Sequence, residues 1–127
     1  MKFLRESESP RDVFEAPYKR TITHIAAPWT CGSKHVWLGT CAYPSGFTSN
    51  PHAHDTQEET FYCISGSGQI KVDGTVYDVG IGDAVFVEPG EVHQCLNLRG
   101  REDFKVVSVV TPPFSRDSFQ KDHTPES

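Results

Sequence analysis

Two histidines and two carboxylates stand close together in the polar stretch from residue 46 to residue 66. His52 and His54 are two residues apart, and Glu58 and Glu59 follow them. Side chains two apart on a β-strand point to the same face, so both imidazoles can reach one point in space. Neutral imidazole and carboxylate groups are ligands that borderline divalent metals prefer. A His-x-His pair by itself, however, more often marks two surface histidines in a polar loop.

A second stretch, residues 82–97, changes this balance because it supplies a third histidine. His93 comes just after Pro89-Gly90. Proline presets its own φ and glycine accepts a positive φ, so a turn is expected there. Together the two stretches favour a metal site over scattered surface histidines.

Set side by side, the two stretches resemble the paired motifs of the cupin superfamily. The first motif has the pattern G-x5-H-x-H-x3/4-E-x6-G, and the residues that match it are Gly46, His52, His54, Glu59 and Gly66. The second has the pattern G-x5-P-x-G-x2-H-x3-N, and the residues that match it are Gly82, Gly90, His93 and Asn97. Glu88 stands in the proline position and Pro89 follows it, which still allows the turn.

The resemblance implies a fold and a ligand set. The fold is all-β, a cupin double-stranded β-helix or jelly-roll barrel, which agrees with many short strands separated by glycine and proline turns. The implied metal ligands are His52, His54, Glu59 and His93. Small cupins of this type commonly pair as homodimers through their sheets, so we expect a homodimer here.

The choice between the two glutamates depends on strand parity. An unbroken strand would place Glu58, four residues after His54, on the ligand face. Glu59 reaches the metal only if residues 55–57 bend or bulge. The family pattern selects Glu59, because six residues then separate it from Gly66.

Three further residues are expected to line the pocket. Phe61 and Cys63 share the strand face of Glu59, and Cys95 shares that of His93. Cys63 is more often a small buried hydrophobic residue, and Cys95 is expected beside the metal without binding it. No catalytic residue is assigned by these patterns.

The remaining chain divides into three parts. We expect residues 1–17 to form a solvated N-terminal lead-in, residues 18–114 the barrel domain and residues 115–127 a flexible polar tail. His123 in that tail has no neighbours in sequence that would make it a ligand. Within the barrel, alternating or apolar runs predict the strands 18–26, 34–43, 69–72, 75–79, 84–87 and 104–111, the last buried on both faces. His24 is expected on a strand surface.

The strand at residues 34–43 has two different faces. Val36, Leu38, Thr40 and Ala42 form the smoother apolar face, which we assign to the barrel interior. Trp37 and Tyr43 then point outward, where large aromatics need a covering surface. An outward aromatic stripe is a sign of a dimer interface.

Composition narrows the class of protein. A chain of 127 residues makes one domain with a single core. Its net charge of −5 argues against nucleic acid or an anionic membrane surface as a partner. No apolar run approaches the about 20 residues of a membrane span, and no apolar signal core follows the N-terminus, so we expect a cytoplasmic protein. The cysteines show no framework spacing and are expected to be free thiols.

The implied ligand set favours a catalytic site for one divalent metal ion, namely Fe, Mn, Ni, Co or Zn. Three neutral histidines and one carboxylate leave a net charge near +1 and open coordination positions. Because the fold hosts many activities, three functions stay open. The preferred one is non-redox, isomerase- or lyase-type chemistry on a small chelating hydroxy-acid, keto-acid or sugar-like substrate. The alternatives are an iron-dependent dioxygenase and a non-catalytic module that binds or senses a small ligand.

Three observations separate these functions. The motifs offer no Arg or Lys for a phosphate, which argues against a sugar-phosphate isomerase, and Phe61 with the apolar strand faces predicts a mostly apolar pocket floor with few charges. Thiol dioxygenases of this fold usually lack the glutamate that this chain keeps. Cys63 and Cys95 would lie near an oxygen-activating centre, which tends to oxidise thiols. The retained glutamate and the two thiols favour non-redox chemistry.

Overall fold

The computed structural model describes residues 1–125 of the chain, which form nine strands, two α-helices and one short 3-10 helix. The strands are β1 (Arg11–Phe14), β2 (Arg20–Ala26), β3 (Trp37–Tyr43), β4 (Glu58–Ser65), β5 (Ser67–Val72), β6 (Thr75–Gly80), β7 (Ala84–Val87), β8 (His93–Leu96) and β9 (Phe104–Thr111). The helices are η1 (Glu6–Glu8), α1 (Pro28–Cys31) and α2 (Arg116–His123). The all-β prediction is confirmed.

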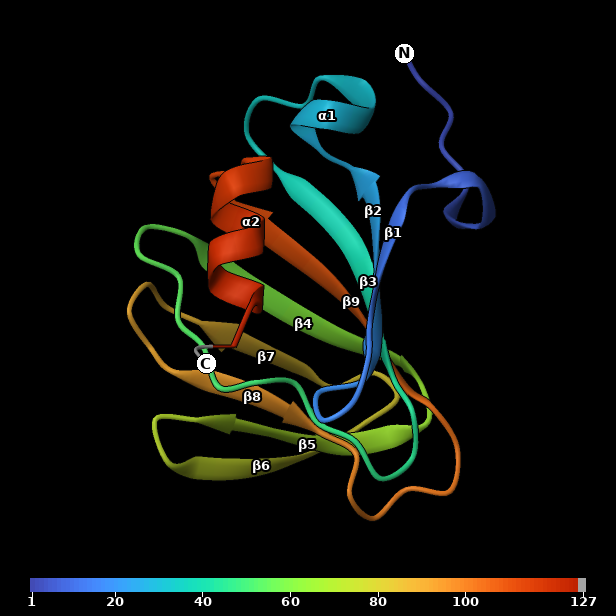
Figure 1. Ribbon diagram of the computed structural model, residues 1–127, viewed down its shortest axis with the longest axis vertical. Coiled ribbons are helices and arrows are strands. Elements are labelled where there is room, and N and C mark those ends of the chain that lie inside the picture. The colour runs from blue at the N-terminus through green and yellow to red at the C-terminus, as the bar shows by residue number, and fades with distance from the viewer. Residues whose placement is uncertain (126–127) are drawn as a thin grey trace.

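The strands form two antiparallel sheets that enclose the core (Figure 1). The larger sheet has the order β1-β2-β3-β9-β4-β7, and the smaller has the order β6-β5-β8. The β5–β6 hairpin turns at Asp73 and Gly74, which both have positive φ, 45° and 87°. This is the turn that an Asp-Gly pair between alternating strands favours.

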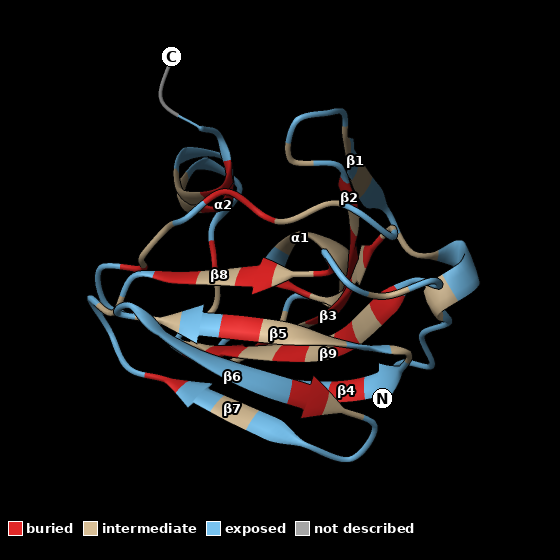
Figure 2. Ribbon diagram, turned by 90° about the horizontal axis from the view of Figure 1, so that it is seen from below, coloured by how far each residue is buried: buried red, intermediate tan, exposed pale blue. Residues whose placement is uncertain are grey.

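Burial alternates along β4, β8 and β9, and Figure 2 shows buried and half-buried stretches following one another on β8 and β9. In β9 the residues Phe104, Val106, Ser108 and Val110 are buried and the residues between them are only half-buried. The prediction that this strand is buried on both faces is therefore wrong. The outer side chains of β9 lie on the outward face of the larger sheet.

The assignment of the two faces of β3 is also wrong. Trp37 and Tyr43 are buried at 1% and 3% exposure, and Leu38 and Ala42 on the other face are only half-buried. The Trp37 ring packs edge-on against Phe114, with centroids 5.4 Å apart. Both faces of this strand are apolar, so alternation alone does not show which one faces inward. The large aromatics fill the barrel because they bury the most apolar area.

The N-terminal segment is part of the larger sheet. Strand β1 pairs with β2 in antiparallel register from Arg11↔Thr23 to Phe14↔Arg20, so this part of the predicted solvated lead-in over residues 1–17 is an edge strand of the barrel. The pairing places Asp12 beside His24, with Oδ2 2.6 Å from Nε2.

His24 is a core residue instead of the predicted surface residue. It is 1% exposed, and its Nδ1 accepts a hydrogen bond of 3.2 Å from Trp37 Nε1. Burial lowers the pKa of His24, although the hydrogen bond to Asp12 opposes this. A neutral ring with Nε2–H donating to Asp12 satisfies both contacts.

Residues 115–123 do not form a flexible tail. Ser115 caps α2 by accepting a hydrogen bond of 3.0 Å from the backbone N–H of Ser118. Phe119 is fully buried and packs against Phe14, His24 and Phe114. The expectation of a mobile tail therefore fails here, and residues 126–127 of that prediction lie outside the described part of the chain.

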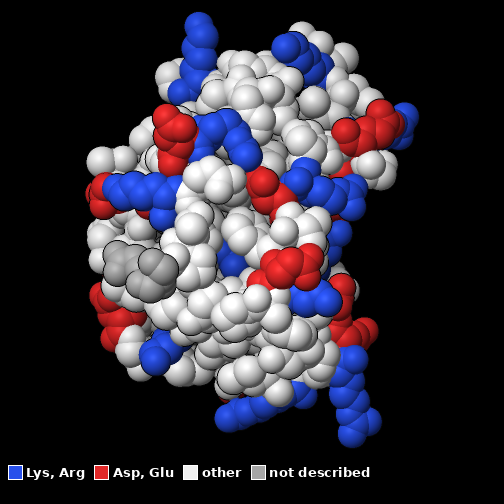
Figure 3. Space-filling view, in the orientation of Figure 1, with Lys and Arg blue, Asp and Glu red and all other residues white. Residues whose placement is uncertain are grey.

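Charged side chains of both signs are interspersed on the face that carries α2 (Figure 3). This face offers no continuous basic surface that would follow a phosphate backbone. Within residues 1–125, the helices are too short and polar for any of them to cross a membrane.

Candidate metal centre

The backbone of the β3–β4 loop brings two histidines to the start of β8. His52 and His93 form an antiparallel bridge, in which the His93 N–H donates to the His52 carbonyl at 2.8 Å and the reverse bond is 3.1 Å. The carbonyl of His54 accepts a bond of 2.9 Å from the N–H of Gly90. Gly90 has φ of 84°, which allows the turn that delivers His93.

The four predicted ligands lie together. One ligand atom from each of His52, His54, Glu59 and His93 lies within 4.8 Å of the other three. Two nitrogen atoms bound to one ion at about 2.1 Å lie at most about 4.2 Å apart, so this upper limit is near the spacing that a single ion requires. His52 is half-buried and the other three residues are buried. The cluster thus meets the geometric demand of a metal site whose ligands come from three parts of the chain.

The chain bends between His54 and β4, which decides between the two glutamates. Residues 55–57 lie outside any strand, and β4 begins at Glu58. Glu59 then points inward at 4% exposure, whereas Glu58 is exposed. Ser108 on β9 donates a hydrogen bond from Oγ to Glu59 Oε2. Glu59 therefore joins the cluster, in agreement with the family pattern over simple parity.

The outer nitrogen of each clustered histidine is held by an oxygen. Nδ1 of His52 lies 2.8 Å from the carbonyl of Asn50, and Nδ1 of His93 lies 3.0 Å from that of Glu91. Nδ1 of His54 lies 2.8 Å from Oδ2 of Asp122. Because these oxygens accept hydrogen bonds, Nδ1 carries the proton in each ring and Nε2 is left for a metal.

Glu59 lies within hydrogen-bond distance of two ring nitrogens that carry no proton when the rings are neutral. Its Oε1 lies 2.9 Å from Nε2 of His54 and 3.2 Å from Nε2 of His93. Each ring can donate from both nitrogens only as an imidazolium. Burial alone would lower the pKa of His54, but Glu59 and Asp122 raise it above its ordinary value.

The carboxylate shows the same pattern. Burial would raise the pKa of Glu59, but the hydrogen bonds from His54 and His93 hold it well below its ordinary value. A divalent cation at the Nε2 atoms would take the place of these protons. The donor set therefore fits a divalent metal ion.

A fourth histidine adjoins the cluster and was missed in the sequence. The ring centroid of His123 lies 4.8 Å from that of His52 and 5.6 Å from that of His54. Its Nδ1 bonds to the carbonyl of Phe119 at 2.8 Å. Burial, together with nearby His54, lowers the pKa of His123 to about 3.

Asp122 and His123 come from α2, and only a weak local signal marks that helix. Ser115 followed three residues later by Ser118 is compatible with a helix start. Neither the position of the helix over the site nor the contact of Asp122 with His54 follows from any spacing in the sequence.

The predicted pocket residues are all buried but lie at different distances from the cluster. The Phe61 ring contacts His93, with centroids 5.8 Å apart. The thiol of Cys63 points to the carbonyls of Ser65 and Gly66. Burial raises the pKa of Cys95 to about 12 and also raises that of Cys63. Their role in lining a substrate pocket stays a prediction.

A cavity of about 360 Å³ opens beside the cluster. It is bordered by the half-buried His52 and by Asp122, and its other lining residues are Tyr18, Asn50, Pro51, Ala53, Lys121, Thr124 and Pro125. Most of the lining residues are polar, and two of them, Lys121 and Asp122, carry opposite charges. The prediction of an apolar pocket with few charges does not hold for this cavity.

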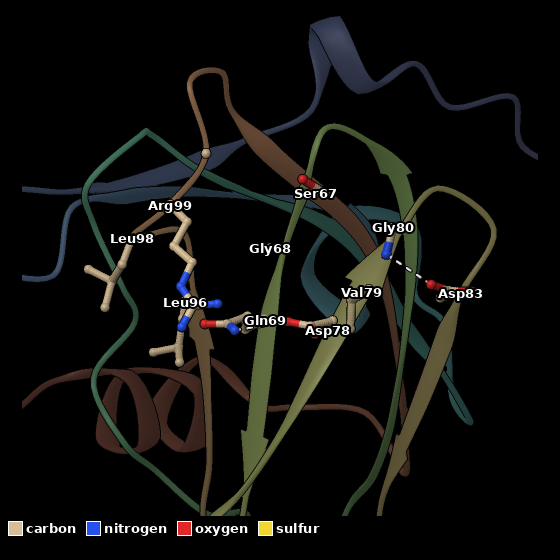
Figure 4. A pocket seen from close by; sticks show the side chains of 11 residues that line it. Ser67, Gly68, Gln69, Asp78, Val79, Gly80, Asp83, Leu96, Leu98 and Arg99 are labelled. Atoms are coloured by element: carbon tan, nitrogen blue, oxygen red, sulfur yellow. Dashed lines mark hydrogen bonds between the residues drawn. The ribbon is translucent and has the colours of Figure 1, made fainter.

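A larger hollow of about 390 Å³ lies elsewhere (Figure 4). It includes Gln69 and Leu96, which pair with each other, whereas His93 pairs with Val72 at the opposite end of the β5–β8 ladder. Because it is remote from the histidines, we place the functional site at the smaller cavity.

Two antiparallel sheets with a histidine–carboxylate centre between them define a small β-barrel protein with a candidate metal site. Residues 39–110 match the cupin domain family. This match covers more than half of the chain, and the protein belongs to that family. The predicted double-stranded β-helix fold is thereby confirmed.

Individual relatives are distant. An uncharacterized protein of Methanocaldococcus jannaschii is 29% identical over 83 residues, which are 65% of this chain and 66% of that protein. The structure of KdgF from Halomonas sp. has a TM-score of 0.76 at 17% identity and covers 92% of this chain and 97% of its own. A predicted oxalate decarboxylase from Thermotoga maritima has a TM-score of 0.74 at 23% identity, covering 87% and 98%. At these identities the two structures show the shared fold alone.

Proposed function

We propose that this cupin is a metal-dependent enzyme that carries out non-redox, isomerase- or lyase-type chemistry on a small chelating hydroxy-acid, keto-acid or sugar-like molecule. The observation that carries the proposal is the cluster of His52, His54, Glu59 and His93, whose ligand atoms lie within 4.8 Å of one another. The adjoining cavity gives a small molecule access to it.

The four residues would hold one divalent ion through three Nε2 atoms and one carboxylate oxygen. When bound, such an ion acts as a Lewis acid on a carbonyl or hydroxyl oxygen. The carbonyls of Asn50 and Glu91 and the carboxylate of Asp122 keep the three rings oriented. Ser108 fixes the second oxygen of Glu59, so the site is ordered before a substrate arrives.

One cationic residue of the cavity lining supports an acid as the substrate. Lys121 lines the cavity, and its Nζ is held 3.0 Å from Oδ2 of Asp55. The positive charge of Lys121 can attract a carboxylate that enters the cavity, although Asp122 on the same wall carries the opposite charge. Tyr18 and Asn50 add polar groups suited to hydroxyl recognition. A small hydroxy- or keto-acid matches these features better than an apolar ligand.

The two alternative functions, an iron-dependent dioxygenase and a non-catalytic binding module, would use the same cluster and cavity. The oxidation argument against an iron-dependent dioxygenase is weaker than expected, because Cys63 and Cys95 are buried thiols with raised pKa values and thiolates are the readily oxidised form. One structural neighbour is described as a predicted oxalate decarboxylase, but that likeness shows the shared fold alone. A non-catalytic binding cupin would use the same cavity without turnover.

An anaerobic screen tests the proposal. Untagged protein loaded in turn with Mn²⁺, Fe²⁺, Co²⁺, Ni²⁺ or Zn²⁺ is incubated with small hydroxy- and keto-acids, and turnover is followed by NMR. We expect turnover without oxygen, and loss of it on Glu59→Ala. Turnover that requires O₂ and consumes it in proportion would favour the dioxygenase. Tight binding without turnover would favour the binding module.

We further propose that the protein forms a homodimer through the outward face of the larger sheet. The paired register Thr60↔Phe86 and Tyr62↔Ala84 places Tyr62 and Phe86 on one face, with 48% and 53% exposure. The half-buried Val107 and Leu38 belong to the same face. Trp37 and Tyr43 are buried in the barrel and do not contribute to this face. A cytoplasmic location, and a small molecule in place of nucleic acid or membrane as partner, remain predictions.

A further inference from the structure

Helix α2 reaches the metal centre from the far end of the sequence. Its Asp122 accepts a hydrogen bond of 2.8 Å from Nδ1 of His54, and both side chains are almost fully buried. Figure 1 shows α2 in front of the larger sheet, with its C-terminal end at the β3–β4 loop that carries His54. The helix therefore contacts a candidate metal ligand directly, although 68 positions separate the two residues.

The C-terminal end of α2 is held by a buried cation. Arg20 is 1% exposed, and its Nη2 donates to the carbonyl of His123 at 3.2 Å and to Oδ1 of Asn50 at 2.8 Å. It forms no ion pair with a carboxylate in residues 1–125, and its Nε has no hydrogen-bond partner there. The guanidinium group therefore faces the partial negative charge at the C-terminal end of the helix.

A helix of eight residues is not stable by itself in water. Its folded state depends on Phe119 in the core, on Arg20 at its end and on the contact between Asp122 and His54. The last contact is the one that involves the site. Because Lys121 and Asp122 also line the cavity beside the cluster, the docked helix forms one wall of that cavity.

We propose that Asp122 is a positioning residue of the metal centre, and that metal binding and docking of α2 are coupled through His54. This inference rests on the proposed metal site. The carboxylate holds the proton on Nδ1, fixes the ring and makes Nε2 a better metal ligand. A metal that immobilises His54 in turn strengthens its bond to Asp122. Since coupling is reciprocal, metal must order the helix as much as the helix favours metal.

Metal affinity tests the positioning role. Competition with a chromogenic chelator gives the dissociation constant for Zn²⁺ in wild type, Asp122→Asn, Asp122→Glu and Asp117→Asn. Asp117 is an exposed acid on the same helix, so its change matches the charge removed. We expect Asp122→Asn to weaken binding about 10- to 100-fold, Asp122→Glu to restore part of it, and Asp117→Asn to stay within about twofold. Asp122→Asn within twofold of wild type would overturn the proposal.

The visible spectrum of the Co²⁺-loaded protein provides a readout that a general loss of stability does not move. Saturating Co²⁺ reports the ligand field at the bound ion even when affinity is reduced. We expect the d–d bands to shift in Asp122→Asn and not in Asp117→Asn. Identical spectra in all three proteins would contradict a role for Asp122 in orienting His54.

Hydrogen exchange tests the coupling itself. Metal should slow amide exchange in residues 119–123 of the wild type, and this protection should be lost in Asp122→Asn. Unchanged exchange on metal addition to wild type would refute coupling. The outcomes separate the two proposals: wild type that binds no metal refutes the metal site itself, whereas metal binding without any effect of Asp122 refutes only this inference.

Discussion

Oε1 of Glu59 lies 2.9 Å from Nε2 of His54, although an unbroken strand would turn these two side chains to opposite faces. The bend at residues 55–57 removes the parity constraint. It brings a carboxylate between two imidazoles in a buried setting, where unpaired charges are costly. The candidate metal centre depends on this local departure from regular strand geometry.

Replacing each glutamate separates the two candidates. Glu59→Ala should lose at least tenfold in affinity for Zn²⁺ or Co²⁺, because it removes the oxygen ligand. Glu58→Ala should stay near wild type, because that side chain is exposed. Isothermal titration of both variants measures the difference. A loss confined to Glu58→Ala would mean that strand parity holds in solution.

Metal removal should lower stability. A ligand that binds only the folded state adds about 2.7 kcal/mol at 100 times its dissociation constant. We expect EDTA to lower the melting temperature of wild type, with no further effect on a His52, His54 and His93 triple-alanine variant. The same drop in both proteins would show that the chelator acts elsewhere.

The metal-free protein should lose stability in mild acid. Burial and nearby His54 lower the pKa of His123 to about 3, and burial also lowers that of His52. An unfolded histidine titrates near 6.5, so between these values the unfolded chain binds more protons and stability falls as pH falls. The stability contributed by the raised pKa of His54 is instead lost as pH rises, above this window.

Urea unfolding of metal-free protein at pH 6.5, 5.5 and 4.5 measures this dependence. Each such histidine contributes about 1.4 kcal/mol per pH unit at most. His123→Gln should reduce the slope by about one proton. An unchanged slope would show that His123 is not buried as a neutral ring.

A charge on the outward face of the larger sheet should disrupt the proposed dimer, whereas a charge on the smaller sheet should not. Phe86→Glu places a charge in the outward apolar face of the larger sheet and should produce monomers in sedimentation velocity. Tyr77→Glu is the matched control, since Tyr77 is 50% exposed on the smaller sheet. An interface of standard size should hold a dimer at roughly tens of micromolar. A wild type that stays monomeric at that concentration would contradict the proposal.

The fold and the four clustered residues could be predicted because their signals are local. Glycines at fixed distances mark turns, and the spacing of His52, His54, Glu59 and His93 relative to those turns matches one family. Structure adds the reason why that spacing works, namely the bridge between His52 and His93.

What could not be predicted depends on contacts between distant parts of the chain. The inward face of β3 was misassigned because both faces are apolar, and only the packing of Trp37 on Phe114 decides between them. Asp122 and His123 reach the site from α2, and Arg20 on β2 holds the C-terminal end of that helix. The short polar segment that forms α2 has no hydrophobic period that would predict where the helix packs. The contacts of such residues with the site can be recognised only in the folded structure.

The most direct test of the metal centre is elemental analysis of untagged protein purified without added metal. We expect about one divalent ion per chain in wild type and none in His52→Ala, His54→Ala or His93→Ala, because each change removes one of only four ligands. Circular dichroism must show the same β-sheet content in all variants. One ion per chain retained by the triple-alanine protein would contradict the assignment.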